Sequence, residues 1–307
     1  MNEPWPEIIG IGSTVYDTLM VVDRFPQEDT KLEGVETRVQ GGGPCATALV
    51  AAQKLGVSTA YMGTIGDDPF GRFMLEDLKR WKVDTSRVRI VPDVVSFHAV
   101  VFLNRSRSTR TCIWNRGTVP QPAPEDVDVS LLRHAKVLHL DGHMLEAAVY
   151  AAALCRREGI KVSHDAGGTY PGIERLMPYV DWLIPSEEFA MKMTGAQTAE
   201  LAAQRLYETY HPELLVLTQG VRGGLLLDGG GMRRYESYPV DVQDSNGCGD
   251  TFHGAFIAAK IKGMTNEQAC CYASAAAAIK CTRLGARHGM PTDKECRAFL
   301  QERGIWL

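Results

Sequence analysis

Residues 244–256 read Asp-Ser-Asn-Gly-Cys-Gly-Asp-Thr-Phe-His-Gly-Ala-Phe, a glycine-bracketed turn that runs into a predicted helix over residues 251–262. Glycine lets the backbone approach a ligand closely, and the free amides at a helix start attract negative charge, so this segment predicts an anion site. Asp250 stands at the same helix start, where a carboxylate is unfavourable beside phosphate alone. It becomes useful when a hydroxyl must lose its proton while it attacks phosphorus. The alternative is that Asp250 only caps the helix, because Asp is a preferred N-cap residue.

Short β-branched runs alternate with helical segments along most of the chain ahead of this turn. Six runs read as buried strands, over residues 8–12, 60–65, 136–140, 161–164, 181–184 and 214–218. Apolar residues recur at helical spacing between them, over residues 44–55, 69–81, 145–157 and 199–210. This alternation predicts an α/β fold in which helices cover both faces of a mainly parallel sheet.

Two stretches, residues 15–39 and 91–115, break this alternation. In the second stretch, residues 96–103 and 109–113 have the pattern of hairpin strands joined by a polar turn. We therefore expect the two stretches to form one accessory sheet. Residues 118–128, with three prolines and several acids, are predicted to be the linker that returns to the main domain.

The composition is that of a globular protein, because 45% of the 307 residues are hydrophobic and can build a substantial core. Asp and Glu number 37 against 33 Lys and Arg, and a formal net charge of −4 offers no broad positive field to nucleic acid. The sequence shows neither a secretory leader nor an apolar run of membrane length, so we expect a soluble, cytoplasmic protein. The eight cysteines have no regular framework spacing, which favours reduced thiols.

The four residues Gly247, Cys248, Gly249 and Asp250 resemble the GAGD signature of the ribokinase-like, or PfkB, carbohydrate kinases. In that family the turn stabilises the charge of the transferring phosphoryl group, and its Asp deprotonates the acceptor hydroxyl. The resemblance implies a ribokinase-like three-layer sandwich with a small β-sheet lid. It implies a single kinase domain over residues 1–307, with the lid inserted from about 15–40 and 91–116.

Other segments resemble the same family, and they occur in the family's order. These segments are residues 10–17, 41–44, 63–71, 218–223 and 273–285. The first two resemble the parts of the family that bind the acceptor. The resemblance therefore implies that Asp17 hydrogen-bonds the hydroxyls of a sugar, and that the backbone of Gly42 and Gly43 packs against it. The expected reaction is transfer of the γ-phosphoryl group of ATP to a hydroxyl, here a primary one, of a sugar or sugar derivative.

The later segments resemble the nucleotide-binding half of the family. Thr218, Gly220 and Gly223 lie in the stretch that resembles the loop meeting the ATP phosphates. Ala273 and Ala277 lie in the stretch that resembles the helix flanking adenine. The resemblance thus implies ATP and Mg²⁺ as cofactors.

The chain departs from the family pattern at several positions. Ala46 stands where an Asn usually touches the sugar. Residues 186–189 align with the NxxE motif that holds Mg²⁺ through water, but they lack its Asn and its final Glu, so Glu187 is the best substitute. As in many relatives, Asp244 and the carbonyl groups around Gly285 are candidates to hold a monovalent cation such as K⁺.

The glycine motif at 41–48 and the stretch 280–287 look closest to the sulfofructose kinase branch of the family. We therefore expect an acceptor with a phosphate or sulfonate, bound in part by Lys31 and Asn115 of the lid. Lys and Asn supply the compact charge and amide donors that such a group needs. Three more lid cations, Arg105, Arg107 and Arg110, could contribute or could be a solvated hairpin face. The exposed edges of the lid strands also suggest a homodimer joined through the lid.

Other readings of these residues lead to different classes of protein. A nucleoside kinase shares the fold and the base, and a non-catalytic sugar-binding regulator would keep the fold alone. A dinucleotide-binding site would need a third glycine at Val15, and the chain has no Walker A lysine motif. His139 and His143 are four residues apart but flank a predicted strand end, where they give no metal-binding face.

Overall fold

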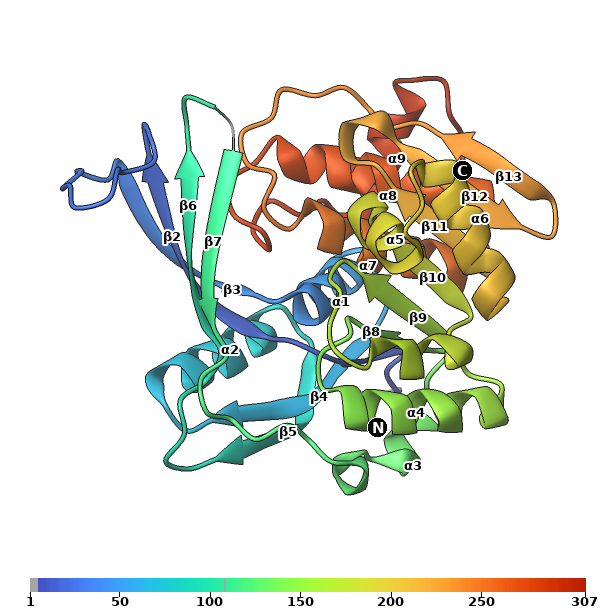
Figure 1. Ribbon diagram of the computed structural model, residues 1–307, viewed down its shortest axis with the longest axis horizontal. Coiled ribbons are helices and arrows are strands. Elements are labelled where there is room, and N and C mark those ends of the chain that lie inside the picture. The colour runs from blue at the N-terminus through green and yellow to red at the C-terminus, as the bar shows by residue number, and fades with distance from the viewer. Residues whose placement is uncertain (1–4, 108) are drawn as a thin grey trace.

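The computed structural model describes residues 5–107 and 109–307, which form two β-sheets and the helices around them (Figure 1). The larger sheet has nine strands in the order β13-β12-β11-β10-β9-β8-β1-β4-β5. These strands are β1 Ile8–Ile11, β4 Thr59–Gly66, β5 Asp84–Val91, β8 Val137–Leu140, β9 Lys161–Ala166, β10 Trp182–Pro185, β11 Leu214–Thr218, β12 Gly224–Asp228 and β13 Gly231–Tyr235. Neighbouring strands from β11 to β5 are parallel, whereas β12 and β13 add to the edge as an antiparallel pair.

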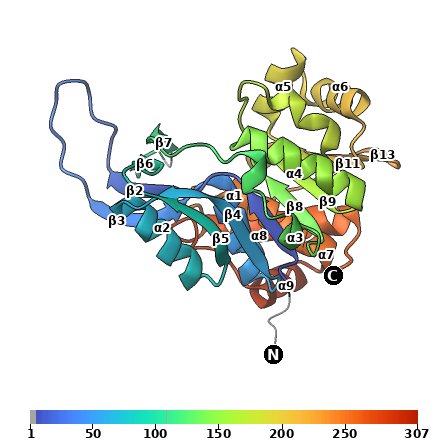
Figure 2. The same ribbon diagram turned by 90° about the horizontal axis from the view of Figure 1, so that it is seen from below.

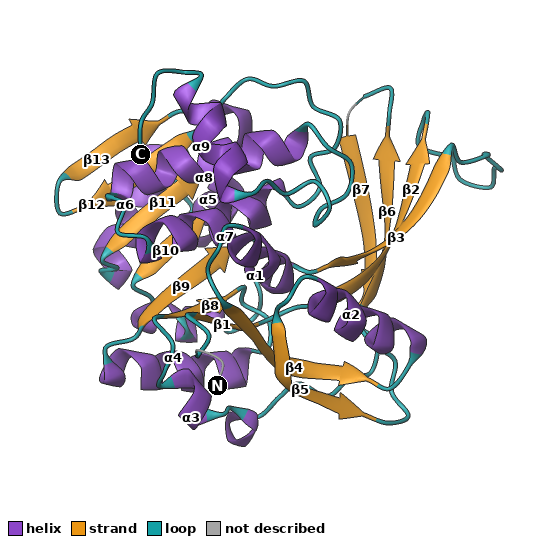
Figure 3. Ribbon diagram, turned by 180° about the vertical axis from the view of Figure 1, so that it is seen from behind, coloured by secondary structure: helices purple, strands orange, loops and turns teal. Residues whose placement is uncertain are grey.

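Helices cover both faces of this sheet (Figure 3). They are α1 Pro44–Lys54, α2 Pro69–Arg80, α3 Val129–Leu132, α4 Leu145–Glu158, α5 Glu187–Thr194, α6 Ala199–Tyr210, α7 Cys248–Ile261, α8 Asn266–Cys281 and α9 Asp293–Gln301. Ile8 of β1 packs in the core shared with α1, α7 and α8, while the next residue, Ile9, packs in the core shared with α4 and α6. Successive strand residues face opposite sides, so two cores enclose the sheet and give three layers, which confirms the predicted fold class.

The smaller sheet has four strands in the order β3-β2-β6-β7. They are β2 Val15–Val22, β3 Glu36–Gly42, β6 His98–Asn104 and β7 Thr109–Asn115. Figures 1 and 2 show this sheet to one side of the main body, with the loop between β2 and β3 extending farthest from it. The register places Asp17 beside Gln40 on one neighbour and Ala99 on the other. The two stretches that break the alternation of strands and helices therefore form one accessory sheet, as predicted.

The helix after the glycine turn begins earlier than predicted. Helix α7 starts at Cys248 instead of residue 251, and Gly247 is its N-cap residue. Asp250 consequently lies inside the first turn and does not cap the helix, so the capping interpretation is wrong. The edge strands β5 and β13, and β12 beside β13, were not predicted. None of the helices in the described part of the chain is long and apolar enough to span a membrane.

Candidate active site

A cavity of about 230 Å³ lies where the small sheet meets the starts of α1 and α7. Asp17, Gly42, Gly43 and Asp250, four of the residues that the sequence proposed for acceptor binding and catalysis, line it together. They come from β2, the end of β3, the N-cap of α1 and the first turn of α7. We call this the acceptor cavity.

The start of α7 leaves backbone donors for a ligand. Gly247 has a φ of 78°, a conformation that favours glycine, and it turns the chain into the helix. The first amides of a helix cannot bond within it. The Cys248 amide donates to the Ser245 carbonyl at 3.3 Å. Among the described residues, no protein acceptor takes the amides of Gly249 and Asp250. These two amides and the helix dipole can therefore hold an anion.

The two carboxylates of the acceptor cavity have raised pKa values. Burial raises the pKa of Asp250 to about 6, and the negative charge of Asp165 adds to the effect. Burial also raises the pKa of Asp17 to about 7, although the positive charge of Arg287 opposes it. A carboxyl group that titrates near neutral pH accepts a proton more readily than an ordinary Asp. Asp250 is thus suited to take a proton from a hydroxyl in this cavity.

A buried ion pair positions Gly42 against Asp17. Arg287 is fully buried, and its guanidinium donates to Asp77 at 2.6 Å and to the Gly42 carbonyl at 2.7 Å. A Cβ atom on Gly42 would lie 2.1 Å from Oδ2 of Asp17, so only glycine fits beside that carboxylate. This pair could not be predicted from the sequence, because Asp77 and Arg287 are 210 residues apart and carry no local pattern.

Two further carboxylates organise the floor beneath the cavity. Asp141 accepts hydrogen bonds from the Ser13 amide at 2.9 Å and the Cys45 amide at 3.1 Å, which ties the end of β1 to the start of α1. Asp165 lies 3.2 Å from Nε2 of His253, one helical turn after Asp250. Neither was predicted, since each acts through residues distant in sequence.

Cys248 is a half-buried thiol in the turn itself. A hydrogen bond with Cys281 lowers the pKa of Cys248 to about 7, and the positive charges of Lys280 and Arg110 act in the same direction. A thiol with such a pKa is partly thiolate at neutral pH and is more reactive than an ordinary cysteine.

The predicted nucleotide residues lie at the end of β11. Thr218 is the last residue of that strand, and Gly220 and Gly223 belong to the short turn that follows it. Ala277 on α8 is partly exposed. Ala273 is fully buried in the core, so it has no surface to offer adenine, and that assignment is wrong.

Glu187, the proposed magnesium-linked acid, lies at the start of α5 and faces this turn. One of its oxygens accepts from Gln219 at 2.9 Å, and the other pairs with Arg222. The described residues contain no group of three or more His, Cys, Asp or Glu that could hold a metal ion. Mg²⁺ commonly binds through nucleotide phosphates, water and only one or two carboxylates, so a site of this kind needs no such group.

Asp244 does not fit the monovalent cation expected there. Its carboxylate accepts from the amides of Asn246 and Gly285, both at 2.8 Å. The buried ammonium of Lys280 lies 3.6 Å from the same carboxylate and donates to the Asp244 carbonyl at 2.6 Å. The Lys280 ammonium therefore supplies the positive charge beside Asp244 that a monovalent cation was expected to supply.

Two predicted acceptor residues lie outside the acceptor cavity. Lys31 lines a separate hollow at the tip of the small sheet, together with Arg24 and Arg107. The side chain of Asn115 is exposed and accepts from the Gly117 amide at 2.9 Å. The lid cation that does line the acceptor cavity is Arg110, which donates to Asn246 at 3.1 Å. Spacing along a hairpin could not show which of its cations points inward.

Comparisons with known proteins agree with this geometry. The family model for "pfkB family carbohydrate kinase" matches residues 6–293. The chain is 25% identical over 303 residues to the ribokinase of Haemophilus influenzae, covering 95% of this chain and 97% of the relative. It is 28% identical over 298 residues to the ATP-dependent ribose-1-phosphate kinase of Halopiger xanaduensis, covering 96% and 98%. The structure of Arabidopsis thaliana ribokinase complexed with ribose and ATP is similar with a TM-score of 0.84 at 25% identity, covering 96% and 98%.

Proposed function

Because this chain belongs to the pfkB family of carbohydrate kinases, we propose that it transfers the γ-phosphoryl group of ATP to a primary hydroxyl of a sugar or sugar derivative bound between Asp17 and Asp250. The observation that carries this proposal is the position of Asp250. A carboxylate with a raised pKa lies at a helix start with free amides, inside a cavity that also holds Asp17. A binding protein needs no base there, so Asp250 favours a kinase over a non-catalytic regulator.

The residues of this site suit an in-line transfer. Asp17 and the backbone of Gly42 and Gly43 orient the acceptor, and Asp250 takes the proton from its hydroxyl. As the oxygen attacks the γ-phosphorus, the proton moves to Asp250 and the bond to the leaving ADP oxygen breaks. The amides of Gly249 and Asp250 stabilise the charge on the transferring group. Mg²⁺ bound with ATP would neutralise phosphate charge.

ATP is proposed to lie along the end of β11, with its phosphates directed from the turn at 218–223 towards the start of α7. The small sheet is proposed to act as a lid inserted into a single kinase domain, because its inward face closes one side of the acceptor cavity. Arg110 brings a positive charge from this sheet to that cavity. An acceptor with an anionic group, such as a sugar phosphate or sulfosugar, suits this arrangement.

The test is a panel of sugars, sugar acids, sugar phosphates and nucleosides, assayed for ADP release and for the phosphorylated product by mass. Asp250→Asn keeps the shape of the side chain and removes the base, so turnover on the best substrate should fall roughly 10²- to 10⁴-fold. Calorimetry should show that this variant still binds ATP. Near-normal turnover by Asp250→Asn, or ADP release with no phosphorylated sugar, would contradict the mechanism.

A further inference from the structure

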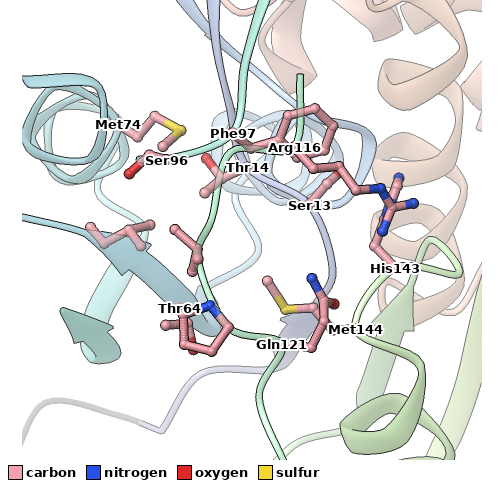
Figure 4. A pocket seen from close by; sticks show the side chains of 13 residues that line it. Ser13, Thr14, Thr64, Met74, Ser96, Phe97, Arg116, Gln121, His143 and Met144 are labelled. Atoms are coloured by element: carbon pink, nitrogen blue, oxygen red, sulfur yellow. The ribbon is translucent and has the colours of Figure 1, made fainter. Parts of the chain in front are cut away.

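A second, smaller cavity of about 40 Å³ lies beside the acceptor cavity and shares Ser13, Phe97 and His143 with it. Figure 4 shows its walls, which come from the loop after β1, the root of the small sheet, the stretch after β7 and the end of β8. A cavity needs roughly 10–15 Å³ to hold one water molecule. This one therefore has room for a few water-sized atoms, such as the oxygens of a carboxylate, sulfonate or phosphate.

The walls of the small cavity carry hydrogen-bond donors without partners. Thr14 and Thr64 are 4% and 5% exposed, and neither hydroxyl has a hydrogen-bond partner among the described residues. Buried polar groups are nearly always paired, so these two hydroxyls leave hydrogen bonds to be made by a group that enters the cavity. Gln121 and His143 line the same space, and no Asp or Glu is among its lining residues. An excess of donors over acceptors suits an anion.

Arg116 supplies the positive charge at the mouth of this cavity. Its guanidinium carbon lies 5.7 Å from the ring centre of Trp114 and 5.8 Å from that of Tyr170. Contacts with two rings restrict where the guanidinium can point. Figure 4 shows Arg116 and His143 on the same side of the cavity. Within residues 5–107 and 109–307, Arg116 has no salt bridge or hydrogen bond, so its five N–H donors are available to a ligand.

The carboxylate that contacts His143 does not compete for the ligand. Asp141 accepts the His143 amide at 3.0 Å and is otherwise occupied by donors from Ser13 and Cys45. Burial lowers the pKa of His143, and the charge of Arg116 acts in the same direction. The ring can still donate one N–H when neutral.

We propose that this cavity binds an oxyanion carried by the acceptor, a carboxylate, sulfonate or phosphate, through Arg116 and the hydroxyls of Thr14 and Thr64. The inference rests on the proposed function and specifies its substrate class. Ser13 and Phe97 line both spaces, so the small cavity adjoins the cavity that holds Asp250. In this proposal Arg116, Thr14 and Thr64 bind the anion, in place of Lys31 and Asn115, which were expected from the sequence to do so.

The test compares Arg116→Met, which keeps the length of the side chain and removes its charge, with Arg105→Met as a matched control. Arg105 lies in the same hairpin but pairs with Asp23 at 2.7 Å, away from both cavities. Substrates are a neutral ketose, its 6-phosphate and 6-sulfonate analogues, a hexonate and adenosine. For the preferred anionic substrate, Arg116→Met should lower kcat/KM roughly 10- to 100-fold, mainly through KM, as expected for a lost charged hydrogen bond. Rates on the neutral ketose should not change, nor should any rate of Arg105→Met.

A binding measurement separates this inference from the proposed function. Calorimetry on Asp250→Asn, with and without Arg116→Met, gives the affinity for each anionic sugar without turnover, and Thr64→Val should weaken it as well. Preference for the neutral ketose or for adenosine, or an equal effect of Arg116→Met on charged and neutral substrates, would overturn the anion site while the kinase assignment stands. If no panel member is phosphorylated, the proposed function fails, and the affinities still decide whether the cavity binds an oxyanion.

Discussion

The pKa values of Asp17 and Asp250 depend on each other's charge and on positive and negative side chains around them. Arg110 favours the ionised form of both carboxylates, whereas Asp165 and Asp141 disfavour that of Asp250. Interacting carboxylates lose their protons in steps that belong to the pair. The pH at which activity is lost on the acid side therefore depends on both carboxylates and their charged neighbours. Removing a positive neighbour should raise that pH, and removing a negative neighbour should lower it.

The rate should depend on pH through Asp250. Its pKa is raised to about 6 and that of Asp17 beside it to about 7, and only deprotonated Asp250 accepts a proton, so kcat/KM should rise as pH increases through this range, the acid limb of the profile, and level off above it. Asp165→Asn removes a negative charge and should shift this limb to lower pH, while Arg110→Met removes a positive charge and should shift it to higher pH. The measurement is kcat/KM from pH 4.5 to 8.5. A limb that stays in place in both variants would contradict the assignment of Asp250.

At the scale of elements, Lys280 on α8 holds the turn that precedes α7. Its ammonium donates to the backbone carbonyl of Asp244, and the Asp244 carboxylate accepts from the amide of Asn246, just before the turn, and from that of Gly285, beyond α8. Both charged side chains are fully buried. The geometry of the glycine turn therefore depends on a contact between the two helices, as well as on its own sequence.

This contact predicts that the enzyme works without a monovalent metal cation. Turnover should be equal in buffers containing K⁺, Na⁺ or tetramethylammonium, because the Lys280 ammonium already stands beside Asp244. Lys280→Met leaves a buried carboxylate without its partner and should cost about 3–5 kcal/mol in the free energy of unfolding, measured in urea. Exposed Lys192→Met on α5 is the control. Strong activation of the native chain by K⁺ would show that an ion binds despite Lys280.

How well an element could be predicted depends on what surrounds it. Strands β1 and β11 are buried on both faces, so they are continuous apolar runs, and the sequence predicted both. Strand β5 lies at the sheet edge with mostly exposed side chains, and its Asp, Ser and Arg residues hid it.

The candidate site divides in the same way. The turn with Asp250 is a local motif and was found, and Asp17 came from a second one. The structure places Lys31 away from the acceptor cavity and Arg116 at the small cavity beside it. The sequence could not predict these positions, because the reach of a hairpin side chain is set by sheet register and packing. The buried pair of Asp77 and Arg287 joins parts of the chain that share no pattern.

At the scale of the whole molecule, the small sheet has two free edges, β3 and β7, and an apolar outer face. Val39 and Ile113, which are 42% and 60% exposed, lie on that face with Val100 between them in the register. Edges and apolar faces of this kind favour pairing with another copy. We propose a homodimer in which a second copy of this chain covers the outer face.

Light scattering coupled to size-exclusion chromatography tests the dimer. The native protein should have the mass of two chains, and Ile113→Glu should have the mass of one, since a charge on the covered face opposes its burial. Trp306→Glu is the control, because Trp306 is 74% exposed near the C-terminus, away from the small sheet. A native protein that is monomeric at micromolar concentration would exclude this assembly.

The anchoring of the small sheet differs between its two ends. Near the body, Gln40 accepts the Ala286 amide at 3.1 Å, and Arg287 holds Gly42, so the part that carries Asp17 is fixed to the core. At the far end, Asp23 and Arg105 pair in solvent. Substitutions at the far end can therefore accumulate at little cost to folding, whereas those at the near end cannot. The acceptor cavity is built on the near end, so sequence drift at the far end leaves both the bound acceptor and the chemistry of phosphoryl transfer unchanged.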